Sequence, residues 1–431
     1  MSHPASPPLP VWRKLGYAVG GLGDSLAFNT ISFYLLYYLI NVADLPPIEA
    51  GFLAGVPRVL LTPLSALAGP LSNRLHARGG RRVFLLVCGP LMGAFFFLQF
   101  YAPPGLDQSA LIVFWWIVQL GLSVATTLTL VSYQAMAAEL TPSSTERMQL
   151  VSLQQGFGVL GALVGPSITL LLVDLLGDAQ SEFNGMGSIY GLIIALMFVT
   201  VFLTTGPAPE SFNRTSPPSF WTDAATVLRQ RPFLLQLGVA FLVASATVVF
   251  NASIIFYLTS VHRIDDLLPW ILLVASISSL VSIVGWNWVS RWSKRGAFTL
   301  GILIFVGALL AMSVLPERSP LLWLLSVLVG VGSITPAIFP KAVLTDVIAA
   351  DQIREGRSRV GLYTGLCGLS TRIGSSFGST LVGWLLALIG FSEGSTQGLR
   401  WIIGFVPSVF LAAIIPCILL FRLPKPTPKP A

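Results

Sequence analysis

Charged side chains are scarce in this chain of 431 residues: Asp, Glu, Lys and Arg make up only 10% of it, whereas apolar residues make up 54%. A soluble domain carries about 25% charged residues, because they cover its water-facing surface. The low charge and a mean hydropathy of +0.79 exclude an ordinary water-soluble domain. They predict a multi-pass integral membrane protein, which we place in the plasma (cell inner) membrane.

Histidine and cysteine are also rare, with three residues of each. They are His3, His76, His262, Cys88, Cys367 and Cys417. Their spacing fits neither a metal site nor a disulfide framework. The sequence shows no Ser/His/Asp arrangement and no phosphate-cradling loop, so we expect no enzyme activity, no cofactor and no metal. The net charge of +7 lies in short loops between apolar runs, which argues against nucleic acid as a partner.

Long apolar runs dominate the rest of the chain. About 20 apolar residues make a helix long enough to cross a hydrocarbon core, and the chain contains twelve such candidates. They lie near 15–40, 48–72, 82–101, 109–138, 147–176, 186–206, 233–260, 267–290, 296–315, 319–347, 359–390 and 399–422. The sequence therefore predicts an all-α membrane protein with twelve transmembrane helices.

The basic residues predict the orientation of these spans. With the N-terminus inside, 19 of the 25 Lys and Arg residues fall in cytoplasmic segments, and three fall in outer loops. Because cytoplasmic loops carry an excess of Lys and Arg, both termini are predicted to be cytoplasmic. The outer three are Arg263, Arg318 and Arg400, and the three within spans are Arg58, Lys341 and Arg372.

The two halves of the chain echo each other. Segment 69–74 after the second span resembles 285–291 after the eighth, and 132–139 resembles 339–346. We predict two pseudo-symmetric six-helix bundles, residues 1–206 and 233–431, joined by a cytoplasmic linker at 207–232. Residues 219–231 of this linker fit either a helix lying on the membrane surface or a plain connector. Repeated halves are typical of transporters whose site lies near the bilayer midplane, between the repeats.

Several motifs occur in the same order as in a known family. They are Lys14-Leu-Gly-Tyr17, Gly20, Gly23, Tyr37-Tyr-Leu, Arg58 with Gly69, Glu146-Arg147, Gln230-Arg-Pro-Phe233 and Pro340–Asp346. The chain resembles the major facilitator superfamily and is similar to its glycoside–pentoside–hexuronide cation symporters, the group of the melibiose/sodium symporter. This resemblance implies alternating access and a small, sugar-like solute.

The chain departs from that group where the cation should bind. The cation-coupled members carry two aspartates after the arginine that matches Arg58, and those positions hold Leu61 and Ser65 here. The sugar-binding aspartate of the first span falls on Ser25, next to Asp24. Since sodium in a site of low dielectric usually needs carboxylate oxygens, we expect no sodium coupling at this place.

Polar residues inside the spans are the candidates for the solute cavity, because a buried polar group in a membrane is costly. They are Asp24, Ser25, Asn29, Arg58, Tyr133, Gln134, Gln155, Lys341 and Arg372. Asp24 is the coupling candidate, either as a proton carrier or as a fixed counter-ion of Arg58 or Arg372. Gln154 and the fourth-span threonines fit either a solute path or hydrogen bonds between helices.

The loop after the second span resembles the cytoplasmic gating motif of the superfamily. Its candidate residues are Gly69, Asn73, Arg74, Arg81 and Arg82. Asn73 occupies the position of an acid that would pair with the basic residues, so the latch is expected to be weak. The alternative is that these arginines only set the topology.

These observations predict a monomeric secondary active or facilitative transporter of a small organic solute in the lipid bilayer, with a proton as the candidate co-transported ion. A lipid or amphiphile porter is one alternative. A non-transporting membrane protein that retains the fold is another. The central cavity would distinguish them. It would be continuous and polar around Asp24, Arg58 and Arg372 in a solute porter, and filled by apolar side chains in a non-transporting protein. In a lipid porter it would have a lateral opening and a strongly apolar wall.

Overall fold

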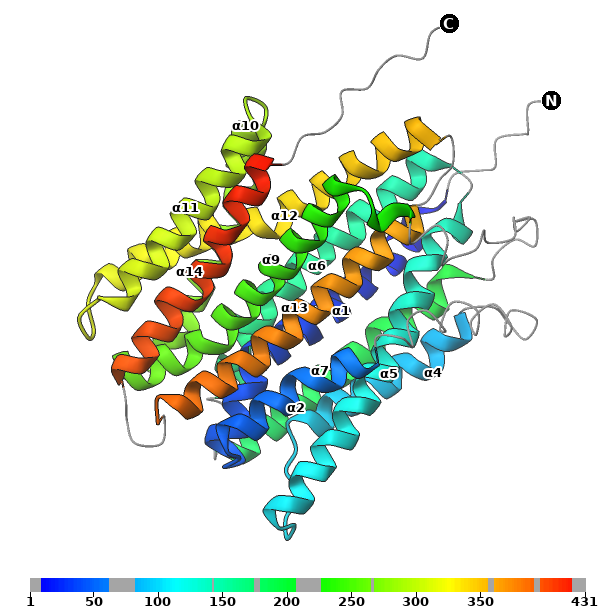
Figure 1. Ribbon diagram of the computed structural model, residues 1–431. Coiled ribbons are helices and arrows are strands. Elements are labelled where there is room, and N and C mark those ends of the chain that lie inside the picture. Colours follow the sequence, from blue (N-terminus) through cyan, green and yellow to red (C-terminus); the bar gives the residue numbers. More distant parts are fainter. Residues whose placement is uncertain are drawn as a thin grey trace, which may run out of the picture. The chain divides into compact units, whose positions relative to one another are not determined.

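A computed structural model describes residues 9–61, 82–141, 143–173, 179–206, 226–264, 267–355, 360–390 and 396–420 (Figure 1). Helices make up the regular structure of these residues, and none of them forms a strand. The α-helices are α1 (Val11–Tyr37), α2 (Pro47–Leu60), α4 (Arg82–Gln99), α5 (Gln108–Leu140), α6 (Ser144–Val173), α7 (Ala179–Thr205), α9 (Arg231–Phe256), α10 (Leu268–Ser290), α11 (Lys294–Ser313), α12 (Leu321–Glu355), α13 (Val360–Leu388) and α14 (Thr396–Leu420). The all-α membrane fold is confirmed, and each predicted range contains a helix.

Among the described residues, nine helical segments are long and apolar enough to cross a membrane. Helix α2 falls short because its described part ends at Leu60, and the range 62–81 lies outside the described residues. Helices α6 and α13 are long, but Gly, Ser and Gln dilute their apolar character. Both pack against a neighbour along much of their length, α6 against α1 and α13 against α9. The twelve-span count and the cytoplasmic termini stay predictions.

The chain divides into two compact units. The first comprises residues 1–45 and 60–214, and the second comprises 46–59 and 215–431. Helix α2 thus groups with the second unit, although the sequence repeat assigns its span to the first set of six. Of the predicted linker at 207–232, residues 207–225 lie outside the described part of the chain. In the part that is described, Val227 is buried against Phe233, Val347 and Tyr363.

In the first unit, α1 is the central helix and packs on α6 and α7. Glycines allow the close approach: a Cβ at Gly161 would lie 2.5 Å from the carbonyl oxygen of Leu22. Small residues at such interfaces are typical of membrane helices, where close backbone packing replaces the hydrophobic effect. Replacing this glycine would push α1 and α6 apart.

Helices α1 and α9 end alike, each in a π-helical turn that begins with a fully buried tyrosine. The turns are η1 (Tyr38–Val42) and η3 (Tyr257–His262). The Tyr38 ring packs against Phe100, Trp115 and Phe183, with centroid distances of 5.3–6.2 Å. Such turns are rare and often lie at functional sites. Their repetition at matching places extends the sequence echo between the halves.

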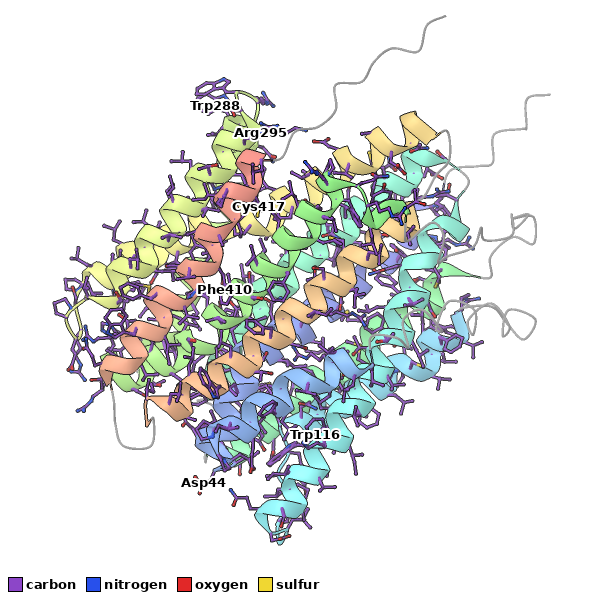
Figure 2. The ribbon with its side chains drawn as sticks, viewed as in Figure 1. Asp44, Trp116, Trp288, Arg295, Phe410 and Cys417 are labelled. Carbon is purple, nitrogen blue, oxygen red and sulfur yellow. The ribbon has the colours of Figure 1, made fainter. Side chains whose placement is uncertain are left out.

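Aromatic and basic side chains gather at the end of α10 and the start of α11. Trp288 and Arg295 lie at this end of the two helices (Figure 2). The Trp288 and Trp292 rings pack with their centroids 4.4 Å apart. Tryptophan with arginine at a helix end is typical of a membrane–water interface, and this end is the cytoplasmic one in the predicted topology.

Candidate functional site

A tyrosine network holds the N-terminal part of α1 in the first unit. The Tyr133 hydroxyl of α5 donates to the carbonyl oxygen of Tyr17 at 2.7 Å, and the two rings stack with centroids 4.7 Å apart. The Tyr17 hydroxyl donates in turn to Gln154 Oε1 of α6 at 3.3 Å. Asp24 is half-buried on α1, seven residues after Tyr17 and so about two turns further along the same face of the helix. The network therefore contains one predicted site residue, Tyr133, and Asp24 follows it along α1.

Ser25 and Asn29 lie where α1 meets α6. A Cβ at Gly158 would lie 3.1 Å from Ser25 Oγ, and one at Gly165 would lie 3.1 Å from Asn29 Cβ. The Asn29 amide donates to the carbonyl oxygen of Ser25 at 2.8 Å, within its own helix. These contacts give both residues a packing role at the helix interface.

The two neighbouring glutamines of α6 have different surroundings. Gln154 accepts from Tyr17, whereas the Gln155 side chain is exposed, as is that of Gln134 on α5. We predicted Gln155 as a cavity residue, whereas the glutamine bonded to the tyrosine network is Gln154.

Helices α2 and α13 of the second unit meet through small residues. A Cβ at Gly383 would lie 2.5 Å from the Cα of Gly51, a distance shorter than real contacts allow. The Ser376 hydroxyl donates to the carbonyl oxygen of Gly55 at 2.7 Å, and that of Thr380 donates to Gly51 at 3.4 Å. The two backbones thus touch without interlocking side chains.

The contact between α2 and α13 also determines the relative positions of two predicted site arginines. Arg58 comes three residues after Gly55, and Arg372 comes four residues before Ser376. The paired residues show that the two helices are antiparallel. Each arginine lies about one turn from the contact, in the same direction along the helix axes, and the two are therefore at a similar depth. Both are half-buried. Two guanidinium groups at one level offer hydrogen-bond donors to an anionic or hydroxyl-rich solute.

Of the two positions that hold the cation-binding aspartates in the similar symporters, the structure describes one. Leu61 is half-buried at the end of the described part of this segment, and Ser65 lies outside it. Lys341 is exposed on α12, one residue after Pro340, whose carbonyl oxygen accepts from the Gln236 amide at 2.7 Å. The predicted pairing of Asp24 with Arg58 or Arg372 stays a prediction.

Of the gating-loop candidates, Gly69, Asn73, Arg74 and Arg81 lie outside the described residues. Arg82 begins α4 and donates to the carbonyl oxygen of Phe202 on α7 at 2.6 Å. Its guanidinium also lies 4.6 Å from the centre of the Phe202 ring. Arg82 therefore has a specific packing role in addition to its charge.

An ion pair near the start of α1 joins two motifs of the family resemblance. Lys14 Nζ lies 3.2 Å from Glu146 Oε1 and also donates to Gln149 at 2.8 Å. Glu146 accepts from the Thr141 hydroxyl at 2.7 Å and from the backbone N–H of Leu9 at 2.9 Å. These donors, the Thr141 hydroxyl first, lower the pKa of the Glu146 carboxyl below its usual range. The motifs that contain Lys14 and Glu146 could be identified from the sequence, but the ion pair between them could not.

The second unit has a matching arrangement at the start of α9. Gln230 accepts from the Tyr363 hydroxyl of α13 at 3.0 Å and donates to Asp351 of α12 at 3.0 Å. The Phe233 and Tyr363 rings meet edge to face with centroids 4.7 Å apart. In each unit, polar residues thus join the first helix of the repeat to the end of the fourth and the start of the fifth.

The chain is similar in sequence to several known proteins. The chain is 24% identical over 415 residues to the uncharacterized symporter YnaJ of Bacillus subtilis (strain 168), covering 95% of this chain and 89% of that protein. It is 24% identical over 420 residues to the glucuronide carrier protein homolog of Escherichia coli (strain K12), covering 94% and 89%. The sphingosine-1-phosphate transporter MFSD2B of Mus musculus is 24% identical over 454 residues, covering 98% and 90%.

A solved structure shares the fold. It is a bacterial homolog of the human lysosomal transporter Spinster in an inward-facing, unoccupied conformation, with a TM-score of 0.70 at 15% identity. The match covers 96% of this chain and 99% of that one. The model of the MFS/sugar transport protein family matches residues 16–425. The chain is therefore a multi-pass integral membrane protein that belongs to the MFS/sugar transport family of the major facilitator superfamily, a family of transporters.

Proposed function

We propose that the protein is a secondary transporter that moves a small, hydroxyl-rich organic solute by alternating access, with Asp24 carrying a co-transported proton. The placement of Asp24 supports this proposal. Asp24 is half-buried in α1, about two turns after Tyr17, whose carbonyl oxygen accepts from the Tyr133 hydroxyl. A carboxyl inside a span next to a polar network is suited to exchanging a proton during transport.

The α2–α13 contact is consistent with such a cycle. Alternating access requires contacts that form and break during each turnover. Gly51, Gly55 and Gly383 bring the two backbones together with few hydrogen bonds between them. Separating the helices would cost little more than those bonds and the dispersion contacts.

The absence of carboxylates after Arg58 makes sodium a poor coupling ion at the usual place. Leu61 offers no oxygen ligand and Ser65 offers a single hydroxyl. Sodium is a hard cation and needs several oxygens, as calcium does. This observation argues against sodium and is consistent with a proton as the coupled ion.

Uptake into proteoliposomes tests this function. Sugars, organic acids and lysolipids are first screened by thermal shift, and the stabilising compound is then followed under a pH gradient or a sodium gradient. We expect an acid exterior to drive uptake by the wild type and the Asp24→Asn variant to lose that response, because an amide cannot exchange a proton. Asp44→Asn is the matched control, since Asp44 is exposed in a loop with φ 54°, a conformation that Asn tolerates.

Two results would count against this assignment. Uptake driven by sodium would refute the loss of the cation site. A pH response that survives Asp24→Asn would remove Asp24 as the coupling group.

An amphiphile porter is the second candidate, because one relative is named a sphingosine-1-phosphate transporter. Lysolipid uptake without sugar uptake in the same screen would favour it.

A further inference from the structure

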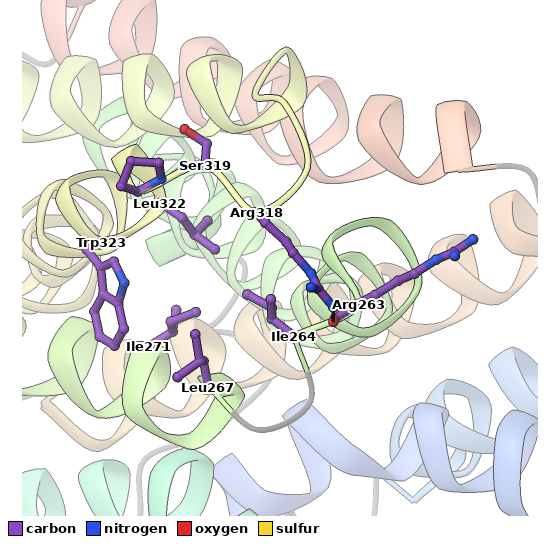
Figure 3. Close-up of a pocket in the computed structure, with 9 residues that line it drawn as sticks. Arg263, Ile264, Leu267, Ile271, Arg318, Ser319, Leu322 and Trp323 are labelled. Carbon is purple, nitrogen blue, oxygen red and sulfur yellow. Dashed lines mark hydrogen bonds between the residues drawn. The ribbon is translucent and has the colours of Figure 1, made fainter.

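A pocket of about 400 Å³ lies in the second unit, where α10 and α12 begin (Figure 3). Its lining combines arginine with apolar side chains: Arg263, Ile264, Leu267, Ile271, Arg318, Ser319, Pro320, Leu322 and Trp323. Leu267, Ile271 and Trp323 lie together on one side, and the Arg318 side chain extends toward Arg263 (Figure 3). The volume is within the range of small-molecule sites. The solute function proposed above uses none of these residues.

Both arginines have an unusual backbone conformation. Arg263 has φ 52° and Arg318 has φ 53°, and the third described non-glycine residue with positive φ is Asp44. A side chain in this region costs about 1–2 kcal/mol, which glycine would avoid. Strain of this kind clusters at ligand-binding and catalytic sites. Arg263 directly follows η3, where a left-handed residue commonly ends a helix, so the two arginines share a turn conformation at the edge of one pocket.

The neighbouring residues hold Arg318 in this conformation. Its backbone N–H donates to Nδ1 of the buried His262 at 3.2 Å. Nε2 of His262 lies 2.8 Å from the Tyr257 hydroxyl. The Arg318 guanidinium donates to the carbonyl oxygen of Arg263 at 3.3 Å, which uses one of its five N–H groups. The other N–H groups of this exposed side chain can donate to a ligand.

The position of the pocket at the ends of two spans favours an amphiphilic ligand. The apolar spans of α10 and α12 begin at Leu268 and Leu321, so the pocket lies at the membrane–water interface. Trp270 and Trp323, 50% and 37% exposed, are typical of that level. A ligand there can place a charged group in water and a hydrocarbon chain along the apolar wall.

We propose that this pocket binds an anionic phospholipid of the adjacent leaflet, the outer one in the predicted topology. The phosphate receives hydrogen bonds from the Arg318 guanidinium, and the first part of an acyl chain lies against Leu267, Ile271 and Trp323. Guanidinium groups suit phosphate because their planar fork donates two parallel bonds. Glu317 precedes Arg318 in the chain, and its negative charge opposes an anion. Removing the Glu317 charge should therefore strengthen binding.

Native mass spectrometry of the purified full-length protein tests this site. Phosphatidylglycerol and phosphatidylcholine with the same acyl chains are added separately, and the fraction of protein that retains one lipid is measured. Arg318→Gly removes the side chain and also relieves the positive φ, so this variant should fold at least as well as the wild type. Loss of charge-assisted hydrogen bonds to phosphate should weaken phosphatidylglycerol binding about tenfold. Arg291→Gly, at the opposite end of α10 and exposed, controls for general loss of surface charge.

A second variant separates a lipid pocket from a charged surface. Leu267→Trp fills the apolar wall but keeps both arginines, and it should also weaken phosphatidylglycerol retention. Glu317→Gln should raise retention, and phosphatidylcholine should bind more weakly throughout. The proposal is overturned if Arg318→Gly binds phosphatidylglycerol like the wild type, or if Leu267→Trp has no effect. Displacement of the lipid by inorganic phosphate alone would also overturn it, because the pocket would then recognise a free anion.

Discussion

The contact between α2 and α13 predicts a large effect from one added methyl group. In Gly383→Ala the new Cβ would lie 2.5 Å from Gly51 Cα, 2.5 Å from the Pro47 carbonyl oxygen and 2.9 Å from Gly51 N. All three are backbone atoms, so no side chain can rotate away. Carbon atoms pack comfortably at about 3.5–4.0 Å, so the helices must separate by about 1 Å.

This separation can be converted into a change in population. Overpacking of a tight interface costs about 1–3 kcal/mol, and about 1.4 kcal/mol corresponds to a factor of ten. The hydrogen bond from Ser376 to Gly55, 2.7 Å long, would weaken at the same time. Conformations with α2 on α13 should therefore become about 5- to 140-fold less populated relative to those in which the helices are apart.

Cysteine labelling measures this change. The three native cysteines are replaced by serine, and Ser376→Cys, at a position that is 4% exposed, reports on the interface. The rate of maleimide labelling in proteoliposomes should rise by the same factor in the Gly383→Ala background. Gly368→Ala on the same helix is the matched control, because an added Cβ there meets nothing within 4 Å and alanine favours a helix.

Equal labelling rates in Gly383→Ala and Gly368→Ala would refute the reasoning. The contact would then either adjust without cost or contribute nothing to the equilibrium between conformations.

Two further predictions concern the ends of helices. Glu146→Gln should lower the melting temperature at pH 7, and this difference should vanish as the pH falls through the lowered pKa of Glu146. A depressed folded-state pKa stabilises above the unfolded value of about 4.3 and is lost in acid; a difference that persists in acid would contradict this. Arg82→Lys keeps the charge but loses the planar contact with Phe202, so thermal unfolding should show a loss of about 1–2 kcal/mol. Unchanged stability would leave Arg82 with a role in topology alone.

The helices themselves could be predicted because the membrane imposes a simple pattern. Apolar runs placed α4 near 82–101 and α10 near 267–290, and the helices span Arg82–Gln99 and Leu268–Ser290. Long runs of this kind leave few alternatives, since every backbone polar group in lipid must be bonded within its own segment. The resemblance to the family was likewise confirmed by the family match over residues 16–425.

The details of the site could not be predicted in the same way. Nothing in the sequence distinguishes Gln154, which joins the tyrosine network, from its neighbour Gln155. The positive φ of Arg263 and Arg318 carries no sequence signal either, because arginine is not a residue that favours this conformation. Both features depend on which neighbour a side chain meets, and that is decided by packing between helices.

The two matching arrangements at the starts of α1 and α9 show what the repeat has preserved. In the first unit the helix start is held by an ion pair, Lys14 with Glu146, and in the second by the uncharged Gln230, bonded to Tyr363 and Asp351. The two arrangements therefore lie at equivalent positions in the two halves, but they are built from different chemical groups. Neutralising Glu146 removes the charge that attracts Lys14 at the start of α1, and it leaves the Gln230 contacts at the start of α9 unchanged. The rate of amide hydrogen exchange in Glu146→Gln should therefore rise at the start of α1 and stay constant at the start of α9. A helix end opens locally more often when an interaction that holds it is removed.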